Sequence, residues 1–256
     1  MATKETNTTH LLGYVLQLAD NSMILGQRLS DWCGHGPVLE QDIAITNIAI
    51  DLIGEARLLY QYAAEIEGNG KTEDDYPYKR DILDWRNVLL VELPNGHWGH
   101  TIVRQFMHDC YHYYMLKALA NSSDTRLSQI ATKTIKEAAY HLKYSSEWVI
   151  RLGDGTEESN GKMQEALDDK MRYFDELFIP SKVEKETSLE GIVVDVEKIK
   201  SDAYAHFEKT INTATLTIPE VAFAQKGGKD GIHTEHLGFV LSDLQFLQKS
   251  YPGASW

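Results

Sequence analysis

The stretch TIKEAAYHLKYSSEW, residues 134–148, decides how this chain is interpreted. Its apolar residues return at helical spacing, so it predicts the middle of a long helix. Glu137 and His141 lie four positions apart on that helix. In an all-helical chain, a buried glutamate near a histidine suggests a carboxylate site for two metal ions. Whether the other helices supply matching ligands therefore decides the functional interpretation.

Composition narrows the class of protein. The chain has 256 residues, of which 43% are hydrophobic and 25% charged, as in ordinary globular proteins. Its net charge of −13 argues against nucleic-acid binding, which needs clustered Lys and Arg. Cys33 and Cys110 form no CxxC pair, which favours a reducing compartment. The sequence shows neither an apolar signal region nor a membrane-length apolar run, so we expect a cytoplasmic protein without a membrane span.

Hydrophobic periodicity predicts an all-α helical bundle with an up-down core of four long helices and additional C-terminal helices, in a single domain over residues 1–256. Residues 68–78 are expected to form a polar loop, and residues 181–198 a charged connection with a short extended piece at 192–194. The turn at residues 121–124 offers capping side chains to the helix that follows. The predicted core helices span about 11–31, 40–67, 96–120 and 125–152, and the additional helices about 81–93, 161–178, 197–212 and 234–249.

Each of the long helices carries one acid in a central position: Asp20, Asp51, Asp109 and Glu137. A di-iron bundle takes a Glu from each of two helices and Glu-x-x-His from each of the other two. The chain departs from this pattern, because Gly54 and Tyr140 occupy the expected histidine positions. His141 comes one residue late, about 100° further around the helix. The spacing therefore predicts degenerate positions that hold no metal.

Two interpretations of these acids stay open at this point. In the first, they are buried in an inactive bundle centre and compensated by basic residues such as Lys133, Lys143, Arg57 or Arg104. In the second, metal is held by shifted ligands, with His112 and His141 joining the acids.

Two further segments contain residue types that carry chemistry. His108 and His112 have the spacing of a zinc protease helix, but Asp109 stands where the general base is a glutamate, so hydrogen-bonded core histidines are the favoured interpretation. The glycine-rich loop from Gly227 to His236 could cradle an anion such as a phosphate group at a helix N-terminus. We favour a tight turn there, in which the histidines and Thr234 cap the last helix.

Four stretches resemble a known family. They are LADNSMILGQRLSDWCGHGPVLEQDIAITNIAIDLIGEAR at 18–57, LLVELPNGHWGHTIVRQF at 89–106, IKEAAYHLKYSSEWVIRLGDGTEES at 135–159 and GGKDGIHTEHLG at 227–238. These stretches closely resemble the C-type subunits of bacterial phenylacetyl-CoA 1,2-epoxidase, in the phenylacetic acid catabolic protein family. The resemblance runs through nearly the whole chain, in order.

The resemblance implies a ferritin-like fold and a structural, non-catalytic role. It implies a related catalytic A subunit as the partner, which carries the di-iron centre and binds phenylacetyl-CoA. It also implies a reductase component with a flavin and an iron–sulfur cluster, which passes electrons from NADPH. No catalytic residue, metal ligand or cofactor is expected in this chain itself. A homo-oligomer stays open, and so do two other functions: an independent di-iron oxidase or hydroxylase with shifted ligands, and a ferritin-like storage protein.

Overall fold

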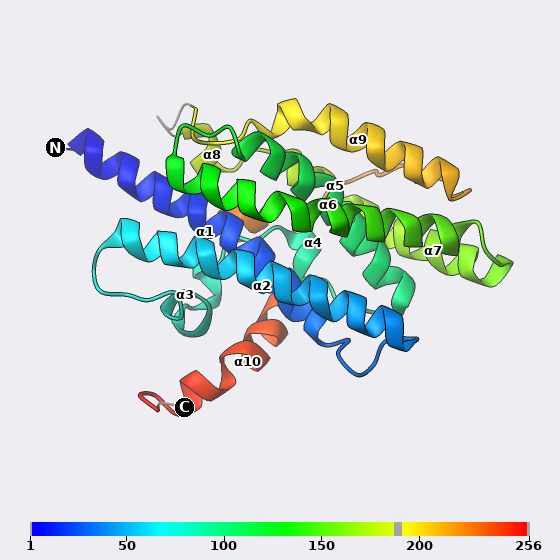
Figure 1. Ribbon diagram of the computed structural model, residues 1–256, viewed down its shortest axis with the longest axis horizontal. Coiled ribbons are helices and arrows are strands. Elements are labelled where there is room, and N and C mark those ends of the chain that lie inside the picture. Colours follow the sequence, from blue (N-terminus) through cyan, green and yellow to red (C-terminus); the bar gives the residue numbers. More distant parts are fainter. Residues whose placement is uncertain (1, 187–190, 255–256) are drawn as a thin grey trace. The chain divides into compact units, whose positions relative to one another are not determined.

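The fold is described from a computed structural model, which covers residues 2–186 and 191–254 (Figure 1). The backbone of these residues forms helices, turns and irregular segments and contains no strand, which confirms the all-α prediction. The helices group into two compact units, one formed by residues 1–94, 181–190 and 227–256 and the other by residues 95–180 and 191–226.

The first unit is built on two long helices, α1 (Ala2–Ser30) and α2 (Leu39–Glu67), which pack along each other (Figure 1). Leu18, Ile24 and Leu59 are among the buried residues at this contact. α2 ends at Gly68, whose φ of 64° is a left-handed conformation that suits glycine. The smaller helices of this unit are α3 (Asp75–Lys79), η1 (Ile82–Asp84), α4 (Leu89–Glu92), α8 (Lys182–Glu186), η4 (Gly228–Asp230) and α10 (Glu235–Ser250).

The second unit is built on α5 (Trp98–Leu119) and α6 (Thr125–Gly153), which α7 (Glu157–Lys170) and α9 (Val196–Thr213) join. The short turns η2 (Met171–Tyr173) and η3 (Asp175–Phe178) follow α7. The expected cap of α6 is confirmed, because the Asp124 carboxylate accepts a hydrogen bond from the Leu127 amide at 2.9 Å. An aromatic cluster closes the core where Phe174 meets Phe207, with ring centroids 4.6 Å apart.

The predicted helix at 81–93 is wrong. Only η1 and the single turn of α4 are helical there, and Trp85 and Val88 have extended backbones. Tertiary contacts explain the difference. The Asp20 carboxylate accepts from the Arg86 amide at 2.9 Å, and the side-chain oxygen of Asn21 accepts from the Val88 amide at 2.8 Å. These amides find acceptors on α1, so the segment loses no hydrogen bonds by leaving the helical conformation.

Smaller differences concern the connections. The predicted loop at 68–78 contains α3, and the predicted charged connection at 181–198 contains α8. The extended piece expected at 192–194 is instead a turn at residue 192, a bend at 193 and irregular backbone at 194. Of the predicted helix at 161–178, only the part up to Lys170 is α-helical, and the 3₁₀ turns η2 and η3 follow it. Within the described residues, no helix is long and apolar enough to cross a membrane.

Candidate functional site

Asp20 is a buried acid of the first unit with several hydrogen-bond partners. Its side chain is fully buried and receives hydrogen bonds from the Tyr60 hydroxyl at 2.7 Å, the Arg86 amide at 2.9 Å and the Arg80 guanidinium. Burial opposes the charge of Arg80, yet the neighbouring Asp20 carboxylate raises its pKa. Burial, followed by the same carboxylate, raises the pKa of Tyr60 well above its ordinary value. Asp20 is therefore a carboxylate held by a cation within the protein.

On α2 the buried acid is Glu55 rather than Asp51. The Ser22 hydroxyl donates to Glu55 Oε1 at 2.9 Å. Asp51 is partly exposed and Gly54 is exposed, so the expected burial of Asp51 is wrong. The helix is turned so that residues 48, 49, 52 and 55 face inward. The spacing of apolar residues did not predict this orientation, because α2 also has apolar residues outside this set.

In the second unit, Asp109 is buried on α5. It accepts hydrogen bonds from Gln105 Nε2 at 2.7 Å and from the Ser145 hydroxyl at 2.8 Å. His112 and His141 are also buried. On α6 the inward residues include Thr134, Ala138, His141 and Ser145, whereas Glu137 is partly exposed and Tyr140 is 50% exposed. The expectation that Glu137 is a buried acid is therefore wrong.

The basic residues expected to compensate the acids lie elsewhere. Lys133 and Lys143 are exposed, and Lys143 faces Glu147. Arg57 forms an exposed ion pair with Glu73 at 3.1 Å. Arg104 is buried and donates to the Asn95 side chain at 2.6 Å. The cation that meets Asp20 is Arg80, which could not be singled out from the sequence because it follows a segment expected to be a loop.

These positions do not fit a di-iron centre. A metal ligand needs free carboxylate lone pairs, but the oxygens of Asp20 face a guanidinium, a hydroxyl and an amide hydrogen. Both oxygens of Asp109 accept from neutral side chains. The surface exposure of Gly54 and Tyr140 means that histidines at these two positions would point to solvent in the conformation described.

The His108–His112 pair lies inside α5, with ring centroids 5.0 Å apart and both rings buried. A different group brings its potential ligand atoms together: His97, His100 and Glu165, whose ligand atoms lie within 4.8 Å of one another. None of the positions singled out from sequence for a di-iron site belongs to this group.

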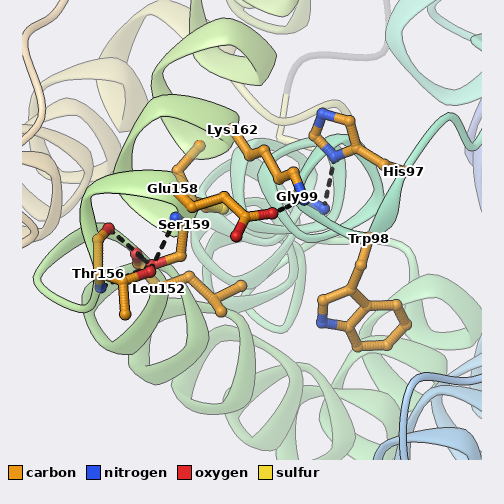
Figure 2. Close-up of a pocket in the computed structure, with 9 residues that line it drawn as sticks. His97, Trp98, Gly99, Leu152, Thr156, Glu158, Ser159 and Lys162 are labelled. Atoms are coloured by element: carbon orange, nitrogen blue, oxygen red, sulfur yellow. Dashed lines mark hydrogen bonds and ion pairs between the residues drawn. The ribbon is translucent and has the colours of Figure 1, made fainter.

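A pocket of about 330 Å³ opens beside this group (Figure 2). Its walls come from the start of α5, the end of α6 and the first turns of α7. Thr156 and Ser159 form a capping box at the start of α7. The Thr156 hydroxyl accepts from the Ser159 amide, and the Ser159 hydroxyl accepts from the Thr156 amide. His97 and Lys162 bring polar groups to a largely apolar wall that includes Trp98, Leu152 and Met163.

The glycine-rich loop is built from internal contacts. Lys229 is buried and faces Glu184 at 3.4 Å. Gly228 lies so close to the backbone that an added Cβ would come within 2.3 Å of the Asn87 oxygen. Thr234 caps α10 as expected, by accepting from the His236 amide. The segment therefore forms a tight turn.

His233 in the same loop is not a capping residue, and that part of the expectation is wrong. Its Nε2 lies 3.0 Å from the Trp85 carbonyl, and its Nδ1 lies 3.2 Å from Glu92 Oε2. The Trp85 carbonyl and the Glu92 carboxylate can both accept hydrogen bonds, so the ring is placed between two acceptors. Glu92 also accepts from the Thr234 amide at 2.7 Å. This cluster ties the start of α10 to α4.

Comparison with known proteins agrees with the sequence resemblance. The model of the family described as "Phenylacetic acid catabolic protein" matches residues 1–256. The chain is 44% identical over 246 residues to an Escherichia coli (strain K12) protein named as the C subunit of 1,2-phenylacetyl-CoA epoxidase, covering 96% of this chain and 99% of that protein. The all-helical structure agrees with the ferritin-like class of this family. The chain belongs to the phenylacetic acid catabolic protein family.

Proposed function

We propose that this chain is the structural, non-catalytic subunit of a phenylacetyl-CoA 1,2-epoxidase, acting in the aerobic degradation of phenylacetate. The observation that carries the proposal is the similarity to a relative named as the C subunit of that enzyme. This similarity runs through 96% of this chain and 99% of the relative, so it extends well beyond any single motif.

The internal contacts of the acids support a non-catalytic role. Asp20 is neutralised by Arg80, and Asp109 is held by Ser145 and Gln105. A carboxylate whose lone pairs already accept such bonds must lose them before it can bind a metal, and breaking a buried ion pair costs several kcal/mol. These contacts favour a structural role for Asp20 and Asp109 over a role as metal ligands.

We infer that the subunit acts by association in the cytoplasm. Its partner is a catalytic A subunit, which supplies the di-iron centre and binds phenylacetyl-CoA, and a reductase supplies electrons from NADPH through a flavin and an iron–sulfur cluster. A metal centre on helices keeps its geometry only when surrounding residues support those helices. A companion chain of related fold could provide this support through helix–helix contacts.

The test is co-expression with the A subunit of the same enzyme. We expect the two chains to co-purify, and phenylacetyl-CoA epoxidation to fall sharply when this chain is omitted. The isolated chain, carrying Glu165→Gln so that the His97, His100 and Glu165 group is incomplete, is incubated with Fe²⁺ and desalted. It should retain less than about one-tenth iron per chain, because the Glu-x-x-His ligand pairs are absent. Stoichiometric iron together with oxygen consumption by the isolated chain would instead identify an independent oxidase, and large cage assemblies would identify a storage protein.

A pair of variants separates support from catalysis. Glu137→Gln and His141→Gln replace the residues that a shifted di-iron site on α6 would require. The proposal predicts that Glu137→Gln, which changes a partly exposed side chain, leaves the activity of the purified complex unchanged. Any loss in His141→Gln should follow the loss of folded complex, because His141 is buried. A complex with either variant that assembles normally but is inactive would contradict the proposal.

A further inference from the structure

The start of α5 and the middle of α7 bring two histidines and a glutamate together in the second unit. We propose that His97, His100 and Glu165 bind one divalent transition-metal ion, with Zn²⁺ as the best match to this donor set. This site is separate from the di-iron positions and does not depend on the proposed function. Two imidazoles and one carboxylate are a donor set that zinc accepts, with a fourth position left for water.

The local structure explains why the three side chains converge. His97 is the N-cap of α5 and His100 lies in its first turn, three residues on, so both rings lie on one side of the helix. Their centroids are 4.3 Å apart. α7 packs against α5 and presents Glu165 to the pair.

The distances are close to those of a bound metal. Glu165 Oε2 lies 3.6 Å from His97 Nε2, and Glu165 Oε1 lies 3.9 Å from His100 Nε2. With metal–ligand bonds of about 2.0–2.1 Å in a tetrahedral site, neighbouring ligand atoms are about 3.4 Å apart. The three ligand atoms lie within 4.8 Å of one another, so binding one ion requires them to close by up to about 1.4 Å. Glu165 can supply part of this movement, because its side chain is 67% exposed.

His100 has an acidic neighbour near the ring nitrogen that does not face Glu165. The Asp169 carboxylate lies 3.7 Å from His100 Nδ1. A carboxylate at that nitrogen is the usual companion of a metal-bound histidine, because it orients the ring and holds the Nδ1 proton.

Metal binding must move the ring protons. The Gly99 amide donates to His97 Nδ1 at 3.1 Å, and Lys170 Nζ lies 3.0 Å from His100 Nδ1. Neutral rings that accept at Nδ1 carry their proton on Nε2, which is the nitrogen that faces Glu165. A metal at Nε2 shifts each proton to Nδ1. The Gly99 amide then loses its acceptor, and Lys170 turns to Asp169, which is already 3.2 Å away.

This rearrangement gives the site a specific signature. It costs a capping hydrogen bond, so the affinity should be lower than that of a preformed zinc site. It also predicts that the backbone amide of Gly99 changes its environment when zinc binds. Of the three proposed ligands, His97 also lines the pocket (Figure 2).

The experiment is a zinc titration of untagged, chelator-treated protein near neutral pH, followed by calorimetry and by elemental analysis after desalting. Because Cys33 is an exposed thiol that could bind zinc, all proteins carry Cys33→Ser. We expect one zinc per chain. Glu165→Gln, His97→Gln and His100→Gln should each weaken binding by at least about 10–100-fold, which is the loss that follows removal of a group that only orients a metal ligand.

Two matched variants lie outside the ligand group. His35→Gln changes an exposed histidine, and Glu158→Gln changes an acid on the wall of the pocket. Both should bind zinc as the parent protein does. In a ¹H–¹⁵N spectrum, zinc should shift the Gly99 amide signal in the parent and leave it in place in Glu165→Gln. Glu165 is exposed, so this variant is expected to fold. No binding by the parent, or equal binding by Glu165→Gln, would overturn the proposal.

Discussion

Replacing Asp20 by asparagine tests the claim that this acid is a structural group. The side chain is fully buried and accepts from Tyr60, Arg80 and the Arg86 amide. Asparagine has nearly the same size but keeps only one acceptor oxygen and turns an N–H group toward these donors. The substitution therefore leaves the Arg80 charge without its counterion in a site where the arginine side chain is only 12% exposed.

The expected loss follows from these contacts. Removing one partner of a buried ion pair typically costs about 3–5 kcal/mol, since the remaining charge is left uncompensated. We expect Asp20→Asn to lower the free energy of unfolding by about 3–5 kcal/mol. The matched control is Glu73→Gln, which removes the acid of an ion pair whose arginine, Arg57, is 67% exposed. That change should cost less than about 1 kcal/mol.

The assay is urea denaturation of the isolated chain followed by far-UV circular dichroism. The double variant Asp20→Asn/Arg80→Met removes the buried charge as well, so it should lose less stability than the two single changes added together. A loss below about 1 kcal/mol in Asp20→Asn, or strict additivity in the double variant, would refute the reasoning.

Further predictions concern thiols, glycines and pH. Ellman's reagent should react with one thiol in the native chain, because Cys33 is exposed and Cys110 is buried. Burial, followed by the charge of Asp109, also raises the pKa of the Cys110 thiol, and reaction of both thiols in the folded protein would contradict this prediction. Gly228→Ala should destabilise the chain by more than about 1 kcal/mol in thermal melts, since its Cβ would collide with backbone. Gly54→Ala, at an open helical site, should stabilise the isolated chain by roughly 0.5–1 kcal/mol, and the opposite order of the two would show that the described packing is incorrect. Burial, and then the charge of Lys209, lowers the pKa of His206 in the folded chain, so His206 takes up a proton more readily in the unfolded chain. The free energy of unfolding should therefore fall as pH drops below about 6.5, and it should fall less steeply in His206→Gln.

The sequence alone determined the fold class and most bounds of the long helices, although α1 begins at Ala2, nine residues before its predicted start at residue 11. The helices expected at 40–67 and 125–152 match α2 and α6 to within about one residue, because their apolar periodicity and flanking turn residues are local signals. The family could also be identified from sequence, since its motifs occur in order along the chain.

Which side of each helix faces inward was decided by tertiary structure. α2 has apolar residues such as Ile43 and Ile50 on its exposed side as well as in its buried stripe, so its sequence could not show that Glu55 rather than Asp51 is buried. The segment at 81–93 leaves the helical conformation because side chains of α1 accept its amide hydrogens.

Tertiary structure also decided the partners of the buried acids and the grouping of the proposed zinc ligands. Asp20 and Arg80 are separated by 60 residues, and Glu165 meets His97 and His100 across two helices. Periodicity reports only which residues share a helix face, whereas pairing between distant side chains depends on how the helices pack. The sequence therefore determined most of the long helices and the family, and only the packing decided which charges meet.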